Sequence, residues 1–221
     1  MDVMGVAEAA ALLEVRPERV RALIHDGRLS ARQVSGRWLI DPDSLDRRAR
    51  AVKKAGRPFS PARAWALLAL ASGRDPHWVS PSARRQLAAV LADRGIGGIH
   101  HQLGQRAGLQ PWYVHPSMIS ALLDEERAVL GGARASGVLR SADPPEVYVA
   151  PDAVDRLVRR YRPDLEPEDA NVVMRIVRGP WPFAPGERKV WPAVAAADLL
   201  DHPDDDRSVR AGHELLDDLR A

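Results

Sequence analysis

Prolines that follow a capping residue divide this chain into many short helices. A proline at the first helical position loses no hydrogen bond, because the N–H that it lacks would be unpaired there, and its φ is already helical. A preceding Ser or Asp caps the helix with a side-chain oxygen. The pattern predicts helix starts at Asp41-Pro42, Ser60-Pro61 and Ser80-Pro81, and, with poorer caps, at His115-Pro116 and Ala150-Pro151.

The first 57 residues predict a small unit of helices and a hairpin. Helices are expected over 6–13 and 16–27, separated by a turn of a few residues, which is the pattern of a minimal helix-turn-helix. Two strand-like segments, 29–34 and 37–40, meet at Ser35-Gly36, a two-residue hairpin signal. A third helix is expected from Pro42 to about Ala55. In this interpretation the core is closed by Val34, Trp38, Ile40 and Leu45.

The remaining chain predicts helices and two strands. The segment 61–72 is apolar nearly all round, which favours a central buried helix. Further helices are expected over 81–94, 116–130, 151–161, 193–201 and 206–220, and strands over 147–150 and 171–177. Segments 131–145 and 179–192 are typical of loops, and the Gly-rich stretch 95–114 favours neither state.

These elements predict a mainly α chain with an α+β part. A winged helix-turn-helix is expected at 1–57, a helical middle region at 58–140 and an acidic α+β domain at 141–221; a single domain over 58–221 is the alternative. The charge is divided in the same way. Residues 1–57 carry 12 Lys/Arg against 8 Asp/Glu, and residues 141–221 carry 11 against 17. A basic part joined to an acidic part indicates one nucleic-acid partner and one other partner.

The second helix of the first unit carries the candidate base-reading residues. In helix-turn-helix modules this helix enters the major groove with its N-terminal residues on base edges. With Val20, Leu23 and Ile24 facing inward, the outward side chains favour DNA contact over a merely solvated surface. The candidates at this helix and the corner behind it are Arg16, Glu18, Arg19, Arg21, His25 and Arg28; those of the hairpin are Arg32, Gln33, Ser35 and Arg37.

A basic run follows the hairpin. The segment 47–57 holds six basic residues and no acidic one, and several of them repeat at helical spacing. Such a stripe is expected to contact phosphates, although late basic residues also favour the helix dipole. With about six phosphates neutralised, log K against log[salt] would have a slope near −5. The candidates are Arg47, Arg50, Lys53 and Lys54.

The first 50 residues resemble a known module. "VAEAAALLEVRPERVRALIHDGRLSARQVSGRWLIDPDSLDRRA" is similar to the excisionase/MerR-like winged helix-turn-helix. The helix start Glu8-Ala9-Ala10, the corner Gly27-Arg28-Leu29, the "VSGRW" hairpin and Leu45 carry the likeness. Two positions differ: Glu14 stands where a Gly often makes the turn, and "DPDSL" is acidic where basic residues are common. The resemblance implies binding to double-stranded DNA.

Residues 58–220 resemble a second family. The clearest matches are "NVVMR" at 171–175 and the tail from Asp198-Leu199-Leu200 to Leu215-Leu216. Together with the preceding segments they are similar to the antitoxins of AbiE-type, type IV toxin–antitoxin systems. That resemblance implies an autorepressor of its own operon whose C-terminal domain counters a nucleotidyltransferase-like toxin. The usual N-terminal domain of that family differs from the module found here.

Signals for catalysis or cofactors are weak. The chain has no cysteine, which excludes disulfides and cysteine-based metal sites. His100, His101 and His115 lack further ligands at helix spacing, and "GIGG" lacks the Lys-Ser/Thr of a phosphate-binding loop. The acidic Asp204-Asp205-Asp206 favours a helix start. We therefore expect no catalytic residues, no metal and no cofactor.

The sequence predicts a non-enzymatic, sequence-specific DNA-binding transcriptional regulator, an antitoxin-like autorepressor. An excisionase-like factor that bends DNA is the alternative, and an enzyme with a DNA-targeting domain is the less favoured one. A homodimer on repeated operator half-sites is expected, because one small module covers little DNA. The start of the chain has no signal-peptide pattern, and its longest apolar run is too short for a membrane helix. A cytoplasmic location without membrane contact is therefore expected.

Overall fold

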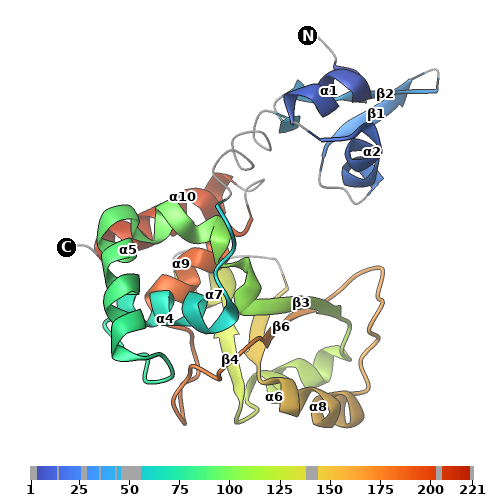
Figure 1. The fold of residues 1–221 in the computed structure, drawn as a ribbon. Helices are drawn as coiled ribbons and strands as arrows, with labels where there is room; N and C mark the ends of the chain where they lie inside the picture. The colour runs from blue at the N-terminus through green and yellow to red at the C-terminus, as the bar shows by residue number, and fades with distance from the viewer. Residues whose placement is uncertain are drawn as a thin grey trace. The chain divides into compact units, whose positions relative to one another are not determined.

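The computed structural model describes residues 4–13, 15–25, 29–34, 36–42, 44–45, 56–137, 144–202 and 206–219. The chain divides into two compact units, Met1–Gly56 and Arg57–Ala221, called here the N-terminal and C-terminal units (Figure 1). Within the described residues, no helix is both long and apolar enough to cross a bilayer.

The N-terminal unit contains two short helices followed by a hairpin. Its elements are α1 (Val6–Leu12), α2 (Pro17–His25), β1 (Ala31–Val34) and β2 (Arg37–Ile40). The antiparallel strands pair Val34 with Arg37, which places the hairpin connection where the sequence predicts it. Gly36 has φ +78°, which costs a glycine nothing and other residues about 1 kcal/mol or more.

One apolar core holds these elements together. Its buried members come from both helices, the strands and the segment after them: Ala9, Ala10, Leu13, Val20, Leu23, Leu29, Ile40 and Leu45. The chain before α1 joins the hairpin, because Ile40 N donates to the carbonyl oxygen of Met4 at 2.9 Å. The third helix expected from Pro42 is described only at Pro42, Ser44 and Leu45, which are helical; the rest of it lies outside the described residues.

The C-terminal unit is built on a four-stranded sheet with strand order β3-β6-β5-β4. Strands β3 and β6 are antiparallel, β6 and β5 are parallel, and β5 and β4 are antiparallel. The strands are β3 (Ala107–Trp112), β4 (Ala128–Gly131), β5 (Glu146–Val149) and β6 (Val172–Val177). The α-helices are α4 (Pro61–Ala71), α5 (Pro81–Ile99), α6 (Ile119–Leu123), α7 (Gly132–Ser136), α8 (Val154–Tyr161), α9 (Pro192–Leu200) and α10 (Asp206–Asp218).

Short 3₁₀ turns precede three of these elements. They are η1 (His100–Gln102) and η2 (Gly104–Arg106) before β3, η3 (Pro116–Met118) before α6, and η4 (Pro151–Ala153) before α8.

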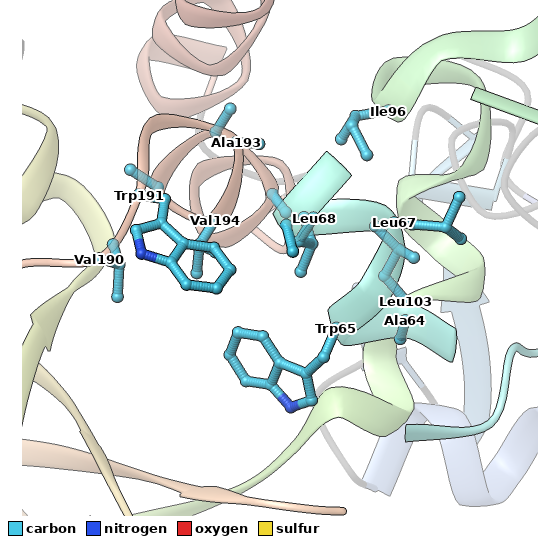
Figure 2. Packing of buried hydrophobic residues seen from close by; sticks show 14 of the residues in the cluster. Ala64, Trp65, Leu67, Leu68, Ile96, Leu103, Val190, Trp191, Ala193 and Val194 are labelled. Atoms are coloured by element: carbon cyan, nitrogen blue, oxygen red, sulfur yellow. The ribbon is translucent and has the colours of Figure 1, made fainter. Parts of the chain in front are cut away.

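The sheet carries a separate apolar core on each face. On one face, Trp112, Val147 and Met174 pack with α6 and α8, which lie together in Figure 1. On the other face, β-strand residues pack with α4, α5 and α9. Helix α4 is buried from Ala64 to Ala69, as its all-round apolar sequence predicts. Figure 2 shows Leu68 of α4 between Val194 of α9 and Ile96 of α5.

The structure corrects the expected secondary structure in the middle of the chain. The predicted helix 116–130 is wrong in its second half, because residues 128–131 form β4. The region 58–140 was expected to be helical, yet it supplies two of the four strands, β3 and β4. Residues 132–136, expected in a loop, form α7. Gly95 does break the helix that begins at Pro81, with φ 59°, but helical turns resume as far as Ile99.

Candidate nucleic-acid interface

Helix α2 presents basic side chains to solvent, because its apolar residues pack into the core on the opposite side. Val20 and Leu23 are buried, and the positions between them face outward. Arg16, Arg19 and Arg21 are all exposed on this side. The helix therefore offers a basic surface along its N-terminal half, the part that reaches base edges in helix-turn-helix modules.

The acidic member of this surface is loosely paired. Glu18 is exposed, and its Oε1 lies 3.7 Å from Nη1 of Arg21. An exposed pair at that distance contributes at most about 1 kcal/mol. Arg21 can therefore leave Glu18 for a phosphate or a base at little cost.

The hairpin extends beyond the core that supports its base. Successive residues of a strand point to opposite faces, yet Arg32, Gln33 and Val34 are all exposed. Both faces of its distal half are therefore open to solvent, and we call residues 31–40 the wing. Figure 1 shows α2 beside the wing within the N-terminal unit.

Val34 does not pack into the core, contrary to the expectation from its apolar side chain. It is 45% exposed, whereas Ile40 at the base of the wing is 1% exposed. The eight buried residues of the core lie at the base of the wing, and none of them covers Val34, so the alternation of the strand alone misplaced this residue.

Several predicted contact residues fall outside what the structure describes. Arg37 belongs to β2 and His25 ends α2, but their side chains are not described. Arg28, Ser35, Arg47, Arg50, Lys53 and Lys54 lie outside the described residues. The predicted contact residues that are described and exposed are Arg16, Glu18, Arg19 and Arg21 at α2, and Arg32 and Gln33 on the wing.

A family comparison matches this part of the chain. A family model described as a helix-turn-helix domain matches residues 3–52. The N-terminal unit is therefore similar to helix-turn-helix domains over most of its length. Comparisons with curated proteins and with solved structures found no match. The match covers α1, α2 and the wing, and it indicates a DNA-binding regulator; it does not extend to the C-terminal unit.

The C-terminal unit contains a buried charge network whose members lie far apart in the sequence. Asp198 of α9 is fully buried. Its Oδ1 accepts from Nη2 of Arg106 at 2.8 Å and from the Tyr148 hydroxyl at 2.5 Å, and its Oδ2 accepts from Gly132 N at 2.9 Å. These contacts join η2, β5, α7 and α9, so one carboxylate ties four elements together.

A second arginine extends the network toward the surface. Arg175 of β6 is 2% exposed. Its Nη1 donates to Asp201 Oδ2 at 3.1 Å, and its Nε donates to Oε2 of Glu146. The other carboxylate oxygen of Glu146 lies 3.0 Å from Nε2 of His202.

The network shifts several pKa values in the direction that keeps its charges. Burial opposes ionisation of Asp201 and Glu146, but the adjoining cations outweigh it and lower the pKa of both carboxyls. The hydrogen bond to Glu146 raises the pKa of His202 above its usual range. Burial raises the pKa of the Tyr148 phenol, which therefore stays a donor.

The sequence signal for this network was a charged residue inside an apolar run. Arg175 interrupts "VVMRIV", and Asp198 interrupts "AVAAADLL". A buried charge requires a partner, so each of these interruptions predicts one. Which residue serves as partner depends on contacts across up to 95 positions, such as Arg106 to Asp201. Within the described residues, no group of three or more His, Asp or Glu side chains is placed to hold a metal ion.

Proposed function

We propose that this protein is a sequence-specific DNA-binding transcriptional regulator that represses its own operon. The observation that carries the proposal is the exposed arginine face of α2 beside a wing that is open on both faces. Arginine suits this role because its fork binds guanine or phosphate oxygens in a bidentate manner. The proposal assigns no catalytic reaction to either unit.

We further propose a homodimer and a protein partner. The protein would bind as a homodimer, with one helix-turn-helix domain on each of two half-sites about one helical turn apart. The C-terminal unit would bind a nucleotidyltransferase-like toxin, the role that the resemblance of residues 58–220 to type IV antitoxins supports. Co-purification with the product of a neighbouring nucleotidyltransferase gene tests this part, and an integrase gene in that place would favour the excisionase-like alternative.

Footprinting tests the proposed operator. The full-length chain is titrated on a fragment that contains its own upstream region, and a discrete protected segment with two half-sites is expected. Uniform protection of the whole fragment would contradict the proposal. The absence of any protected segment at protein concentrations high enough for non-specific DNA binding would contradict it as well.

Substitutions in α2 test whether this helix makes the contacts that produce the footprint. Replacing Arg19 and Arg21 together with alanine removes two side chains from the basic face, and each lost base contact should cost about 1–3 kcal/mol. Arg159→Ala serves as the matched control, because Arg159 is an exposed helical arginine of the C-terminal unit. Equal losses in the two variants would assign the effect to general charge and not to α2.

A further inference from the structure

A cavity opens on the sheet of the C-terminal unit, next to the charge network. Its volume is about 450 Å³. Small-molecule sites in proteins usually measure about 300–1,000 Å³ and combine apolar walls with a few convergent polar groups. The cavity lies between β3, β5 and β6 on one side and α7, α9 and α10 on the other, wholly within the C-terminal unit.

The walls are mostly apolar and one end is polar. Leu109, Val173 and Leu199 line the apolar part, whereas Glu146, Arg175 and His202 lie together at the polar end. Leu109 is 61% exposed at the rim, the largest exposed fraction among the large hydrophobic residues described. An apolar ligand body would cover it.

The polar end has donors without acceptors. Nη2 of Arg175 is buried and donates to none of the described residues. Leaving a buried charged donor unpaired is costly, more so than for a neutral group. His202 bonds Glu146 through Nε2, and no described residue hydrogen-bonds its Nδ1. When His202 is protonated, Nδ1 is a second donor, and its half-exposed side chain leaves that donor open to a ligand.

Glu146 lies between these two side chains, and each of its carboxylate oxygens bonds one of them through another nitrogen. One accepts from Arg175 Nε and the other bonds His202. This carboxylate holds the two cationic side chains side by side.

We propose that this cavity binds a small organic acid, with its carboxylate at Arg175 and His202 and its apolar body against Leu109, Val173 and Leu199. A carboxylate supplies the acceptors that the two donors lack, and a charge-assisted hydrogen bond is about twice as strong as a neutral one. This site goes beyond the proposed DNA-binding function and does not depend on it, since all its residues belong to the C-terminal unit.

Calorimetric titration of the full-length chain tests the site with defined probes. Benzoate and hexanoate are compared with benzyl alcohol and hexan-1-ol, which keep the apolar body but lose the charge. We expect saturable one-to-one binding of the acids and at least about tenfold weaker binding of the alcohols, since loss of one charge-assisted bond is worth about that factor. Equal affinities for acid and alcohol, or Kd values weaker than about 10 mM for both acids, would overturn the proposal.

Two variants place the binding in this cavity. His202→Ala should weaken benzoate binding about tenfold, whereas His115→Ala, which removes an exposed histidine bonded to Ser117, should leave it unchanged. Leu109→Glu places a carboxylate at the exposed rim, where folding tolerates it, and should weaken benzoate more than benzyl alcohol. If benzoate binds the His202→Ala and Leu109→Glu variants as it binds the unsubstituted protein, the ligand lies elsewhere and the proposal fails.

Discussion

Asp198 shows how much of the C-terminal unit depends on a single side chain. It is fully buried and accepts hydrogen bonds from Arg106, Tyr148 and Gly132. Gly132 also has φ +60°, which only glycine adopts readily, so the α7 start is shaped to present its N–H to this carboxylate. An aspartate in an apolar helix is thus a structural centre of the unit.

Replacing Asp198 with asparagine should destabilise the C-terminal unit strongly. The change removes one of the two carboxylates that pair with the buried Arg106, Asp198 and Asp201, and removing one partner of a buried pair costs about 3–5 kcal/mol. Denaturant unfolding followed by tryptophan fluorescence measures this, because five of the six tryptophans belong to the C-terminal unit. Asp169→Asn, at an exposed position, is the control and should change stability by less than about 0.5 kcal/mol. Similar losses of stability in the two variants would show that the charge network does not stabilise the C-terminal unit.

The helices with proline starts could be predicted from sequence, and the strands of the middle region could not. Helix α4 begins at Pro61 and α5 at Pro81, each after a serine, because a proline start is a local feature; Ser80 also accepts a capping hydrogen bond from Ala83 N, whereas the Ser60 side chain makes no capping bond. The segment 128–131 is short and apolar, and such a run fits a buried helix turn and a buried strand equally well. Its pairing with β5 decides between them, and that contact is not visible locally.

The two ends of the wing differ in burial, and substitutions at each end test this difference. Val34→Ala at the exposed tip should change stability by less than about 0.5 kcal/mol. Ile40→Ala at the buried base should cost about 2–5 kcal/mol, since it leaves a cavity in the core. Amide hydrogen exchange of peptides from residues 4–25 reports the stability change in each variant, because these residues share the core with Ile40. Faster exchange in Val34→Ala than in Ile40→Ala would reverse the assignment of tip and base.

At the scale of the whole chain, the sequence predicted the basic helix-turn-helix unit but not the chemistry of the C-terminal unit. The recognition helix follows from local periodicity, as the buried Val20 and Leu23 show. The charge network joins Arg106, Glu146 and Asp201 over long separations, which only the sheet topology brings together.

The network and a second cluster predict how stability depends on pH. Hydrogen bonds from Arg156 and Tyr161 outweigh burial and lower the pKa of Glu125, and Glu146 and Asp201 are lowered too. A carboxyl with a lowered folded pKa contributes stability that is present above its unfolded pKa and is lost as pH falls through the folded value. His202 has a raised pKa, so its contribution is complete below its ordinary 6.5 and is lost as pH rises through the folded value.

Unfolding midpoints in urea, followed by tryptophan fluorescence, should therefore be highest at mildly acidic to neutral pH. They should fall steeply below about pH 4.5, where the carboxyls of the unfolded chain bind protons first. Glu125→Gln should make this acid limb shallower, whereas Glu168→Gln, at an exposed position, should not. Midpoints that rise as pH falls below about 4 would contradict the direction of these shifts.

If the N-terminal unit reads a DNA sequence, competition between two duplexes shows it most directly. The affinity of the full-length chain is measured for a duplex from its own upstream region and for a random duplex of equal length, at the same salt concentration. Specific binding is typically about 10³-fold or more tighter than non-specific binding. We predict a ratio of that order, and its reduction in the Arg19→Ala/Arg21→Ala variant. Equal affinities for the two duplexes would contradict the account.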